Sequence, residues 1–167
     1  GKPAKDIDLL GAGSLIPLKQ YDIFIDAVSE IQKIFPGTTA ALIGDGPEKN
    51  RLQQLISRKG LESVITLTGE LPYYQVLQYM QRAKVLLHPS AYEGFGMVCT
   101  EALYAGAEVV SFVKPMQQHI PGWHQAADKK EMVHKAVSLL TQQQASPEPH
   151  PFRTIDETAR EMMTLFL

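Results

Sequence analysis

The sequence contains a single cysteine, Cys99, so it cannot form an internal disulfide, as is typical of a reducing compartment. It has no excess of positive charge, because its formal net charge is −2, and we therefore expect no nucleic-acid partner. No apolar run approaches the roughly 20 residues that a membrane-spanning helix needs. These absences exclude a disulfide scaffold and favour a cytoplasmic protein.

The composition that is present is that of an ordinary globular protein. The chain has 167 residues, of which 44% are hydrophobic and 20% are charged, which suits one domain with a hydrophobic core. It begins at Gly1-Lys2-Pro3 without an initiator methionine. Since a predicted strand follows within a few residues, we expect a piece of a longer protein, cut within a linker.

Short apolar runs alternate with helical stripes along the chain. The runs predict strands at 7–12, 40–44, 64–67, 84–88 and 108–112, and the stripes predict helices in between, at 97–105 and at 132–140. Gly46-Pro47 is expected to open the second helix, and Thr154 with Glu157 forms a capping-box pattern for a last helix to about residue 166. This alternation predicts an α/β fold, a Rossmann-like three-layer αβα sandwich with a parallel sheet. Ligands of such sheets bind beyond the carboxyl ends of the strands.

The segment 89–103 carries the most chemical information. It follows the fourth predicted strand, and Gly94 and Gly96 allow a ligand to approach the backbone where a helix begins. The free N–H groups at a helix N-terminus bind phosphate. We expect Glu93 at the rim and Glu101 about one turn into the helix, both as acceptors for sugar hydroxyls. The alternative is a loop with two glycines and two solvated glutamates.

The motif Pro-Ser-x2-Glu-Gly-Phe-Gly-x4-Glu-Ala-Leu, which contains Glu93 and Glu101, resembles the signature of retaining GT-B glycosyltransferases, especially family four, or group 1. The similarity extends over residues 9–112. The segment from Gly13 to Lys19 resembles the family's Gly-Arg-Leu-x3-Lys, and residues 43–48 and 67–69 also match its pattern in the right order.

The resemblance implies roles for the matching positions. Glu101 would bind the ribose, Glu93 would orient the donor sugar, and Lys19 would neutralise the diphosphate. Glu93 and Lys19 are thus the expected catalytic residues. The remaining expected donor-binding residues are Gly13, Ser14, Gly46, Leu71, Gly94, Phe95, Gly96, Met97 and Val98, with Leu71 bordering the base through its main chain.

The resemblance also implies an activity. Residues 1–167 would be the C-terminal, donor-binding half of a GT-B fold, and an acceptor-binding N-terminal domain would precede Gly1. The enzyme would transfer a hexose from a UDP, GDP or ADP sugar to a hydroxyl acceptor with retention, without a metal or other cofactor. We expect a role in polysaccharide or glycolipid synthesis, with peripheral membrane contact through the preceding domain at the inner face of the membrane.

Two departures from the family pattern keep alternatives open. Ser14 stands where the family has arginine, and one lost charge-assisted contact costs about 1.5–3 kcal/mol. The segment 114–123 matches no part of the family pattern. The alternatives are therefore a degenerate glycosyltransferase-like subunit with weak or no donor binding and an unrelated Rossmann-like binding module.

Four other patterns are weaker. Asp6-x-Asp8 resembles a metal-binding motif, but it precedes the first strand and lies at the wrong end of the sheet. His119 and His124 lack a third ligand for zinc. His88 ends a predicted strand and faces the crevice, either as a donor contact or, as we favour, as a hydrogen-bonded structural histidine. Tyrosines on the third predicted helix indicate packing rather than base stacking; they are Tyr73, Tyr74 and Tyr79.

Overall fold

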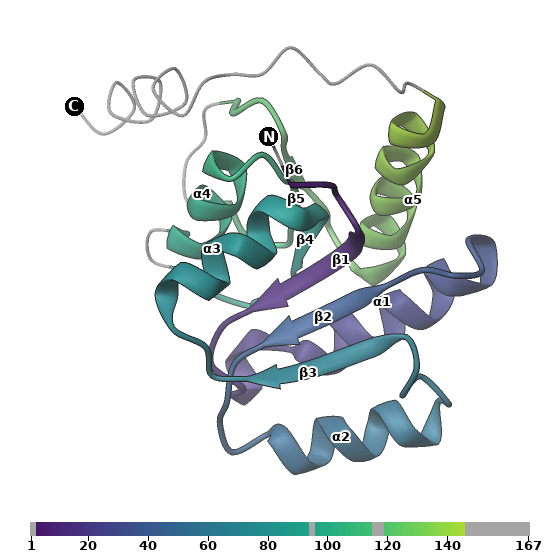
Figure 1. Ribbon diagram of the computed structural model, residues 1–167, viewed down its shortest axis with the longest axis vertical. Helices are drawn as coiled ribbons and strands as arrows, with labels where there is room; N and C mark the ends of the chain where they lie inside the picture. The colour runs from purple at the N-terminus through teal and green to yellow at the C-terminus, as the bar shows by residue number, and fades with distance from the viewer. Residues whose placement is uncertain (1–2, 94–95, 115–118, 146–167) are drawn as a thin grey trace.

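The computed structural model describes residues 3–93, 96–114 and 119–145 (Figure 1). Its strands are β1 (Ile7–Ala12), β2 (Ala40–Ile43), β3 (Ile65–Gly69), β4 (Ala83–His88), β5 (Glu108–Ser111) and β6 (Trp123–Gln125). Its helices are α1 (Tyr21–Ile34), α2 (Lys49–Arg58), α3 (Tyr73–Arg82), α4 (Met97–Tyr104) and α5 (Lys129–Ala145), with a short 3-10 turn η1 (Pro17–Lys19). Within these residues, no helix combines the length and the apolar character needed to cross a membrane.

The strands form one six-stranded sheet in the order β3-β2-β1-β4-β5-β6. Every pair of neighbouring strands is parallel, which confirms the predicted Rossmann-like architecture. The chain moves outward from β1 to β3 and then returns to place β4 on the other side of β1. The order therefore reverses between β1 and β4, and in open α/β sheets this switch point is where ligands bind.

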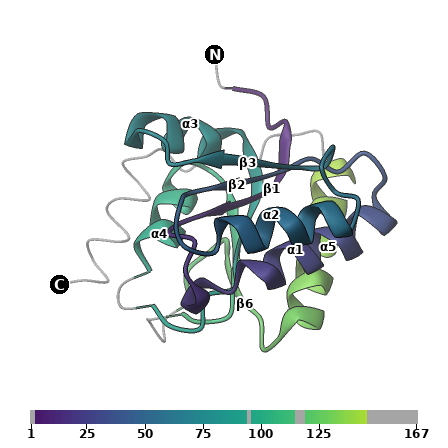
Figure 2. The same ribbon diagram turned by 90° about the horizontal axis from the view of Figure 1, so that it is seen from below.

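Alternate residues of the central strands supply two separate cores. Leu9, Val85 and Leu87 face one side, where α1, α2 and α5 cover the sheet. Leu10 and Leu86 face the other side, under α3 and α4. Figure 2 shows the sheet between these two helical layers. Because both faces are covered, the central strands are mostly apolar, with few polar residues such as Asp8 and Lys84.

Helix α1 illustrates how a helical stripe becomes a packed face. Phe24, Val28 and Ile31 recur at helical spacing and are fully buried against the sheet. The helix ends at Ile34, just before Pro36-Gly37. Pro36 favours this end because the residue before a proline is driven out of the helical conformation.

The structure differs from the predicted elements in several places, among them α5, which spans Lys129–Ala145 instead of 132–140. Helix α2 begins at Lys49, because Pro47 lies in a turn whose next residue, Glu48, donates its N–H to the Leu15 carbonyl at 2.9 Å. The fifth strand ends at Ser111. Strand β6 was not predicted, since it has three residues and only Trp123 is buried. The helix predicted from Thr154 lies outside the described residues.

Candidate functional site

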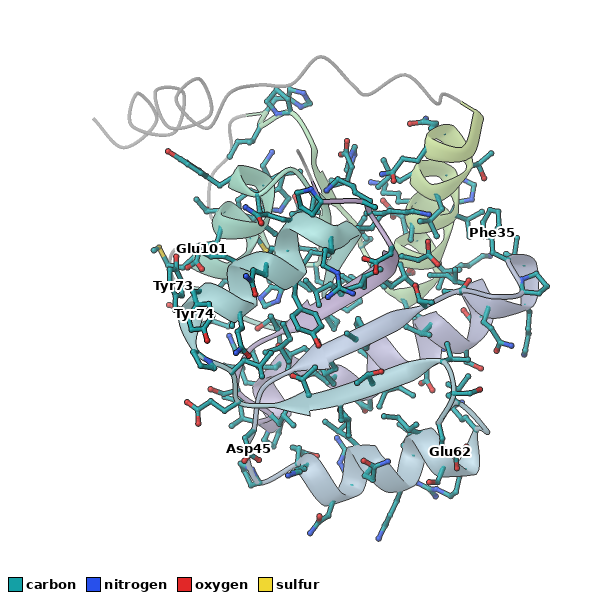
Figure 3. All side chains as sticks on the ribbon, in the orientation of Figure 1. Phe35, Asp45, Glu62, Tyr73, Tyr74 and Glu101 are labelled. Atoms are coloured by element: carbon teal, nitrogen blue, oxygen red, sulfur yellow. The ribbon has the colours of Figure 1, made fainter. Side chains whose placement is uncertain are left out.

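The carboxyl edge of the sheet gathers most of the residues predicted to bind a donor. The arrowheads of β1, β2 and β3 point to the left in Figure 1. In the same view, Asp45, Tyr73, Tyr74 and Glu101 lie along that edge, and Phe35 lies at the opposite end (Figure 3). The segments after β1 and β4 meet there at the switch point of the sheet.

Lys19 and Glu93 are in direct contact at this point. The Lys19 Nζ donates to Glu93 Oε1 at 2.9 Å. The same Oε1 lies 2.5 Å from His88 Nε2. The two predicted catalytic residues are therefore brought together, and His88, which we expected to be a hydrogen-bonded structural histidine, is the second partner of Glu93.

Backbone and side-chain hydrogen bonds join the two segments around this contact. The Gln20 amide donates to the Pro89 carbonyl at 2.8 Å. The Ala91 N–H donates to the Leu18 carbonyl at 3.0 Å. These two bonds bracket Lys19 on one segment and hold the start of the β4–α4 loop beside η1, so that Glu93 and Lys19 meet.

The position predicted for Glu93 at the rim is wrong, because its side chain is only 11% exposed. The loop turns back at Ser90, whose buried hydroxyl donates to the Tyr92 carbonyl at 2.8 Å. Glu93 thereby returns to the end of β4 instead of pointing to solvent. Burial opposes its ionisation, but the hydrogen bonds and charges of Lys19 and His88 outweigh burial and lower the pKa of Glu93. Glu93 is therefore a carboxylate at neutral pH.

Tyr21 adds a buried hydroxyl that was not predicted as part of the site. Its Oη is buried and has no hydrogen-bond partner among the described residues. A Cβ placed on Gly13 would lie 2.5 Å from this oxygen, so the hydroxyl occupies the space that a side chain at Gly13 would fill. The pKa values of Tyr21 and of the Cys99 thiol are raised, first by burial and then by the charge of Glu93. Tyr21 begins an apolar helical stripe, and for that reason its sequence position indicates only packing.

The N-terminus of α4 lies next to Glu93 along the chain. Gly96 precedes this helix with φ 63° and ψ 37°, a left-handed conformation that glycine adopts without strain. No side chain caps this end among the described residues, so its first N–H groups are available to an anion. Met97 is exposed, Val98 is partly buried and Glu101 lies about one turn into the helix. Gly94 and Phe95, both predicted donor-binding residues, lie outside the described residues.

The tyrosines of α3 do not all pack as predicted. Tyr73 and Tyr74 are each 62% exposed, and Tyr73 lies beside Glu101 (Figure 3). The pKa of Tyr73 is raised, first by desolvation and then by the negative charge of Glu101. Tyr79 does pack against the core. The prediction was wrong for the first two because they lie at the start of α3, beyond the part of the helix that covers the sheet.

The turn after β2 supports the loop after β1. The Leu15 N–H donates to the Asp45 carbonyl at 2.9 Å, and a Cβ on Gly46 would lie 2.5 Å from the Leu15 carbonyl oxygen. Gly46, predicted to bind the donor, thus has a packing role in shaping the loop that carries Ser14. The Ser14 side chain is exposed, and Leu71, the residue predicted to border the base, is partly buried against the core of α3 and α4.

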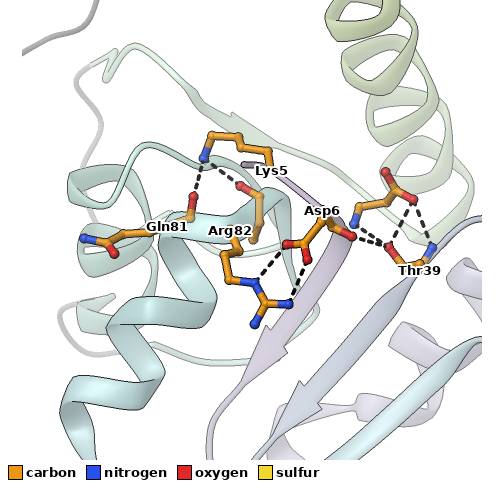
Figure 4. Close-up of polar contacts among 7 residues, drawn as sticks. Lys5, Asp6, Thr39, Gln81 and Arg82 are labelled. Carbon is orange, nitrogen blue, oxygen red and sulfur yellow. Dashed lines mark hydrogen bonds and ion pairs between the residues drawn. The ribbon is translucent and has the colours of Figure 1, made fainter. Parts of the chain in front are cut away.

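The acidic pair set aside as a metal site lies at the amino edge, as predicted. Asp6 accepts two hydrogen bonds from Arg82, at 2.8 and 2.9 Å (Figure 4). Asp8 pairs with Lys84 at 2.7 Å and accepts from the Thr39 N–H at 2.9 Å. Both carboxylates therefore already have cationic partners. In the part of the chain that the structure describes, no group of three or more His, Cys, Asp or Glu residues could hold a metal ion.

The chain is similar to known glycosyltransferases over most of its length. The family model described as glycosyl transferases group 1 matches residues 1–148. An uncharacterized glycosyltransferase of Methanocaldococcus jannaschii is 33% identical over 102 residues, which is 61% of this chain and 27% of that protein. The GtfA subunit of a UDP-N-acetylglucosamine–peptide N-acetylglucosaminyltransferase from Streptococcus agalactiae is 32% identical over 66% of this chain and 21% of that protein. The chain spans about a fifth to a third of the length of the curated relatives it matches.

Solved structures share the fold. Anabaena HepE in complex with UDP and glucose aligns with a TM-score of 0.72 at 25% identity, covering 95% of this chain and 44% of that one. Pneumococcal GtfA in complex with UDP and GlcNAc aligns with a TM-score of 0.73 at 20% identity, covering 96% and 35% of the two chains. The sheet and its helical layers are thus those found in GT-B glycosyltransferases.

Proposed function

The chain belongs to the glycosyl transferases group 1 family, and we propose that it is the donor-binding domain of an enzyme that transfers a hexose from a nucleotide-diphosphate sugar to a hydroxyl acceptor. The observation that carries this proposal is the contact of Lys19 with Glu93 at the switch point of the sheet. A cation and an ionised acceptor lie there beside a helix N-terminus that no side chain caps among the described residues. This combination suits a ligand with both phosphate and hydroxyl groups.

Each part of the ligand has a matching feature. The diphosphate would lie between Lys19 and the N–H groups at the start of α4, and the sugar would reach Glu93. Glu101, farther along α4, would accept a hydrogen bond from the ribose, and the base would extend toward Leu71 and the exposed Tyr73. The leaving phosphate, held by these donors, would assist the incoming hydroxyl and lead to retention at the anomeric carbon. The catalytic contribution of the site is thus electrostatic.

The remaining parts of the proposed enzyme lie outside this chain. The acceptor would bind to a preceding N-terminal domain, which is also where a peripheral contact with the inner face of the membrane would occur in a cytoplasmic enzyme of polysaccharide or glycolipid synthesis. Ser14 contributes no charge, so the donor-binding domain offers Lys19 as its cation beside the start of α4. A second cation from the preceding domain would then strengthen the grip on the diphosphate.

Calorimetric titration of the chain with UDP, GDP, ADP and their glucose derivatives tests the proposal. We expect a UDP or UDP-sugar complex, since HepE was solved with UDP and glucose. Glu101→Ala should weaken binding about 10-fold through loss of a hydrogen bond to a charged group. Glu62→Ala is the matched control, because Glu62 is exposed at the opposite end of the sheet (Figure 3), and it should leave the affinity unchanged.

A separate affinity measurement tests whether Lys19 contacts the phosphates of the ligand. Lys19→Ala should weaken the binding of a nucleoside diphosphate about 10- to 100-fold and the binding of the nucleoside hardly at all. Lys33→Ala, at an exposed position of α1, should change neither affinity. Equal losses for both ligands would contradict a phosphate contact. Failure of the wild-type chain to bind any of the nucleotides would favour a degenerate subunit over a donor-binding domain.

A further inference from the structure

His88 is a buried histidine with one side in contact with the proposed site. It ends β4, its side chain is 1% exposed, and its Nε2 lies 2.5 Å from Glu93 Oε1. Its Nδ1 is buried and has no hydrogen-bond partner among the described residues. The pKa of His88 is lowered: burial lowers it most, Glu93 partly offsets this, and the charge of Lys19 lowers it further. His88 is therefore neutral at pH 7.

The contact with a carboxylate determines which nitrogen of His88 carries the proton. A neutral imidazole has one N–H donor and one bare acceptor nitrogen. Glu93 is ionised and can only accept, so the proton belongs on Nε2, where it is donated to Oε1. The bare nitrogen is then the buried Nδ1, and no N–H donor is left unsatisfied.

The two partners of Glu93 differ in their freedom to move. His88 is held at the end of the central strand β4, with its Cα paired with that of Ser111 in β5, and its short side chain is enclosed. Lys19 is 21% exposed and carries a flexible four-carbon side chain. When an anionic ligand arrives, Lys19 can therefore turn toward it while His88 stays with Glu93.

We propose that His88 is a positioning residue, whose Nε2–H holds the Glu93 carboxylate in place for the donor sugar when Lys19 turns from Glu93 to the donor phosphates. This inference rests on the proposed function for the identity of the ligand. The contact of His88 with Glu93 exists without any ligand. In the free protein the charges of Lys19 and Glu93 cancel, so a diphosphate competes with Glu93 for the cation, and His88 keeps the carboxylate hydrogen-bonded after that exchange.

The other titratable groups around Glu93 do not take over this role. The Tyr21 hydroxyl and the Cys99 thiol both have raised pKa values and stay neutral at pH 7, and neither donates a hydrogen bond to the carboxylate in the part of the chain that the structure describes. Lys19 is the facing cation. The charge state of this cluster near neutrality thus depends on Lys19, Glu93 and the neutral His88.

The ligand test compares the affinities for UDP-glucose and for UDP. His88→Leu removes the donor at similar size, so it should weaken UDP-glucose about 10-fold, as expected for loss of one hydrogen bond to a charged group, and should change UDP by less than about 2-fold. His88→Gln keeps an N–H near the position of Nε2 and should restore most of the loss. Equal losses for both ligands, or no rescue by glutamine, would overturn the positioning role.

A matched control is available in a second histidine–glutamate pair. His124 Nε2 lies 3.0 Å from Glu108 Oε2, away from the switch point, and its side chain is 37% exposed. His124→Leu should leave the affinities for both ligands unchanged. A similar selective loss of UDP-glucose in this variant would show that the effect of His88→Leu is not specific to Glu93.

Nitrogen-15 NMR of the histidine side chains tests the contact without a ligand. At pH 7.5 we expect His88 to be protonated on Nε2 alone, with a pKa below the usual range. Glu93→Gln should lower the pKa of His88 further, because it removes the negative charge that favours the imidazolium. A proton on Nδ1, or an imidazolium at pH 7.5, would overturn the inference. If the wild-type chain binds neither ligand, the proposed function fails, and the NMR result then decides whether His88 holds Glu93.

Discussion

The two edges of the sheet hold their charged side chains in different ways. At the amino edge, Asp6 and Arg82 form an exposed pair, with side chains 56% and 40% exposed, and Asp8 and Lys84 form a partly buried pair, at 19% and 25%. At the carboxyl edge, Lys19 and Glu93 are only 21% and 11% exposed. The unpartnered buried atoms of the described residues, Tyr21 Oη and His88 Nδ1, belong to residues at this same edge.

Unpartnered buried polar groups indicate a binding site more specifically than ion pairs do. Exposed ion pairs contribute about 0–1 kcal/mol, and they occur wherever opposite charges meet on a surface. A buried polar group without a partner costs about 1–3 kcal/mol, so a fold keeps one where something other than stability requires it. Tyr21 and His88 therefore distinguish the carboxyl edge more sharply than the ion pairs do.

The largest expected effect comes from the turn that supports this edge. In Gly46→Ala, the new Cβ would lie 2.5 Å from the Leu15 carbonyl oxygen, and we expect a loss of about 3 kcal/mol in the free energy of unfolding. Gly60→Ala is the control at the other edge, because Gly60 has φ 67° and an added Cβ would meet no atom of the described residues within 4 Å. It should lose only about 1 kcal/mol from the left-handed backbone. Urea denaturation measures both, and equal losses would mean that the turn yields to the added methyl group.

A smaller loss of stability is expected when one cation is removed from the ion pair at each edge. Lys19→Met leaves the mostly buried Glu93 with His88 alone, which should cost about 1–3 kcal/mol. Arg82→Met removes one partner of an exposed pair and should cost about 0.2–1 kcal/mol. Denaturant unfolding of both variants at pH 7 provides the comparison. If Arg82→Met proves the more destabilising, the contrast drawn between the two edges is wrong.

Much of the fold was predictable, because the strands contain short apolar runs and helices such as α1 carry a periodic apolar stripe. The run in β4 and the stripe of Phe24, Val28 and Ile31 are examples. Strand β6 was missed because three residues with one buried side chain carry no periodicity. The strand order was also out of reach, since alternation predicts a parallel sheet but not which strands are neighbours.

The sequence predicted which residues belong to the candidate site, but it did not predict how they are arranged in space. Lys19 and Glu93 were both expected in it, but their contact depends on β1 lying beside β4, which local sequence does not encode. Glu93 was misplaced at the rim because the turn through Ser90 is a tertiary feature. His88 was predicted as a hydrogen-bonded histidine, while its partner followed only from the folded loop.

The smallest effect is the pH dependence of stability that His88 adds to the carboxyl edge. The pKa of His88 in the folded protein lies below its usual value, mainly because of burial, so near pH 6 the unfolded chain binds more protons than the folded one. The contribution of His88 to the free energy of unfolding is therefore complete above about pH 6.5, the usual pKa of histidine. It is lost as the pH falls below that value. The free energy of unfolding of the wild type should decrease between pH 7 and pH 5, and His88→Gln should flatten that decrease.

Arg82→Met should leave the slope in this window unchanged, because the pKa of its partner Asp6 is lowered by the Arg82 hydrogen bond and Asp6 titrates in more acidic solution. A slope that persists in His88→Gln would assign the proton uptake to a group other than His88 and would remove the pH contrast between the two edges.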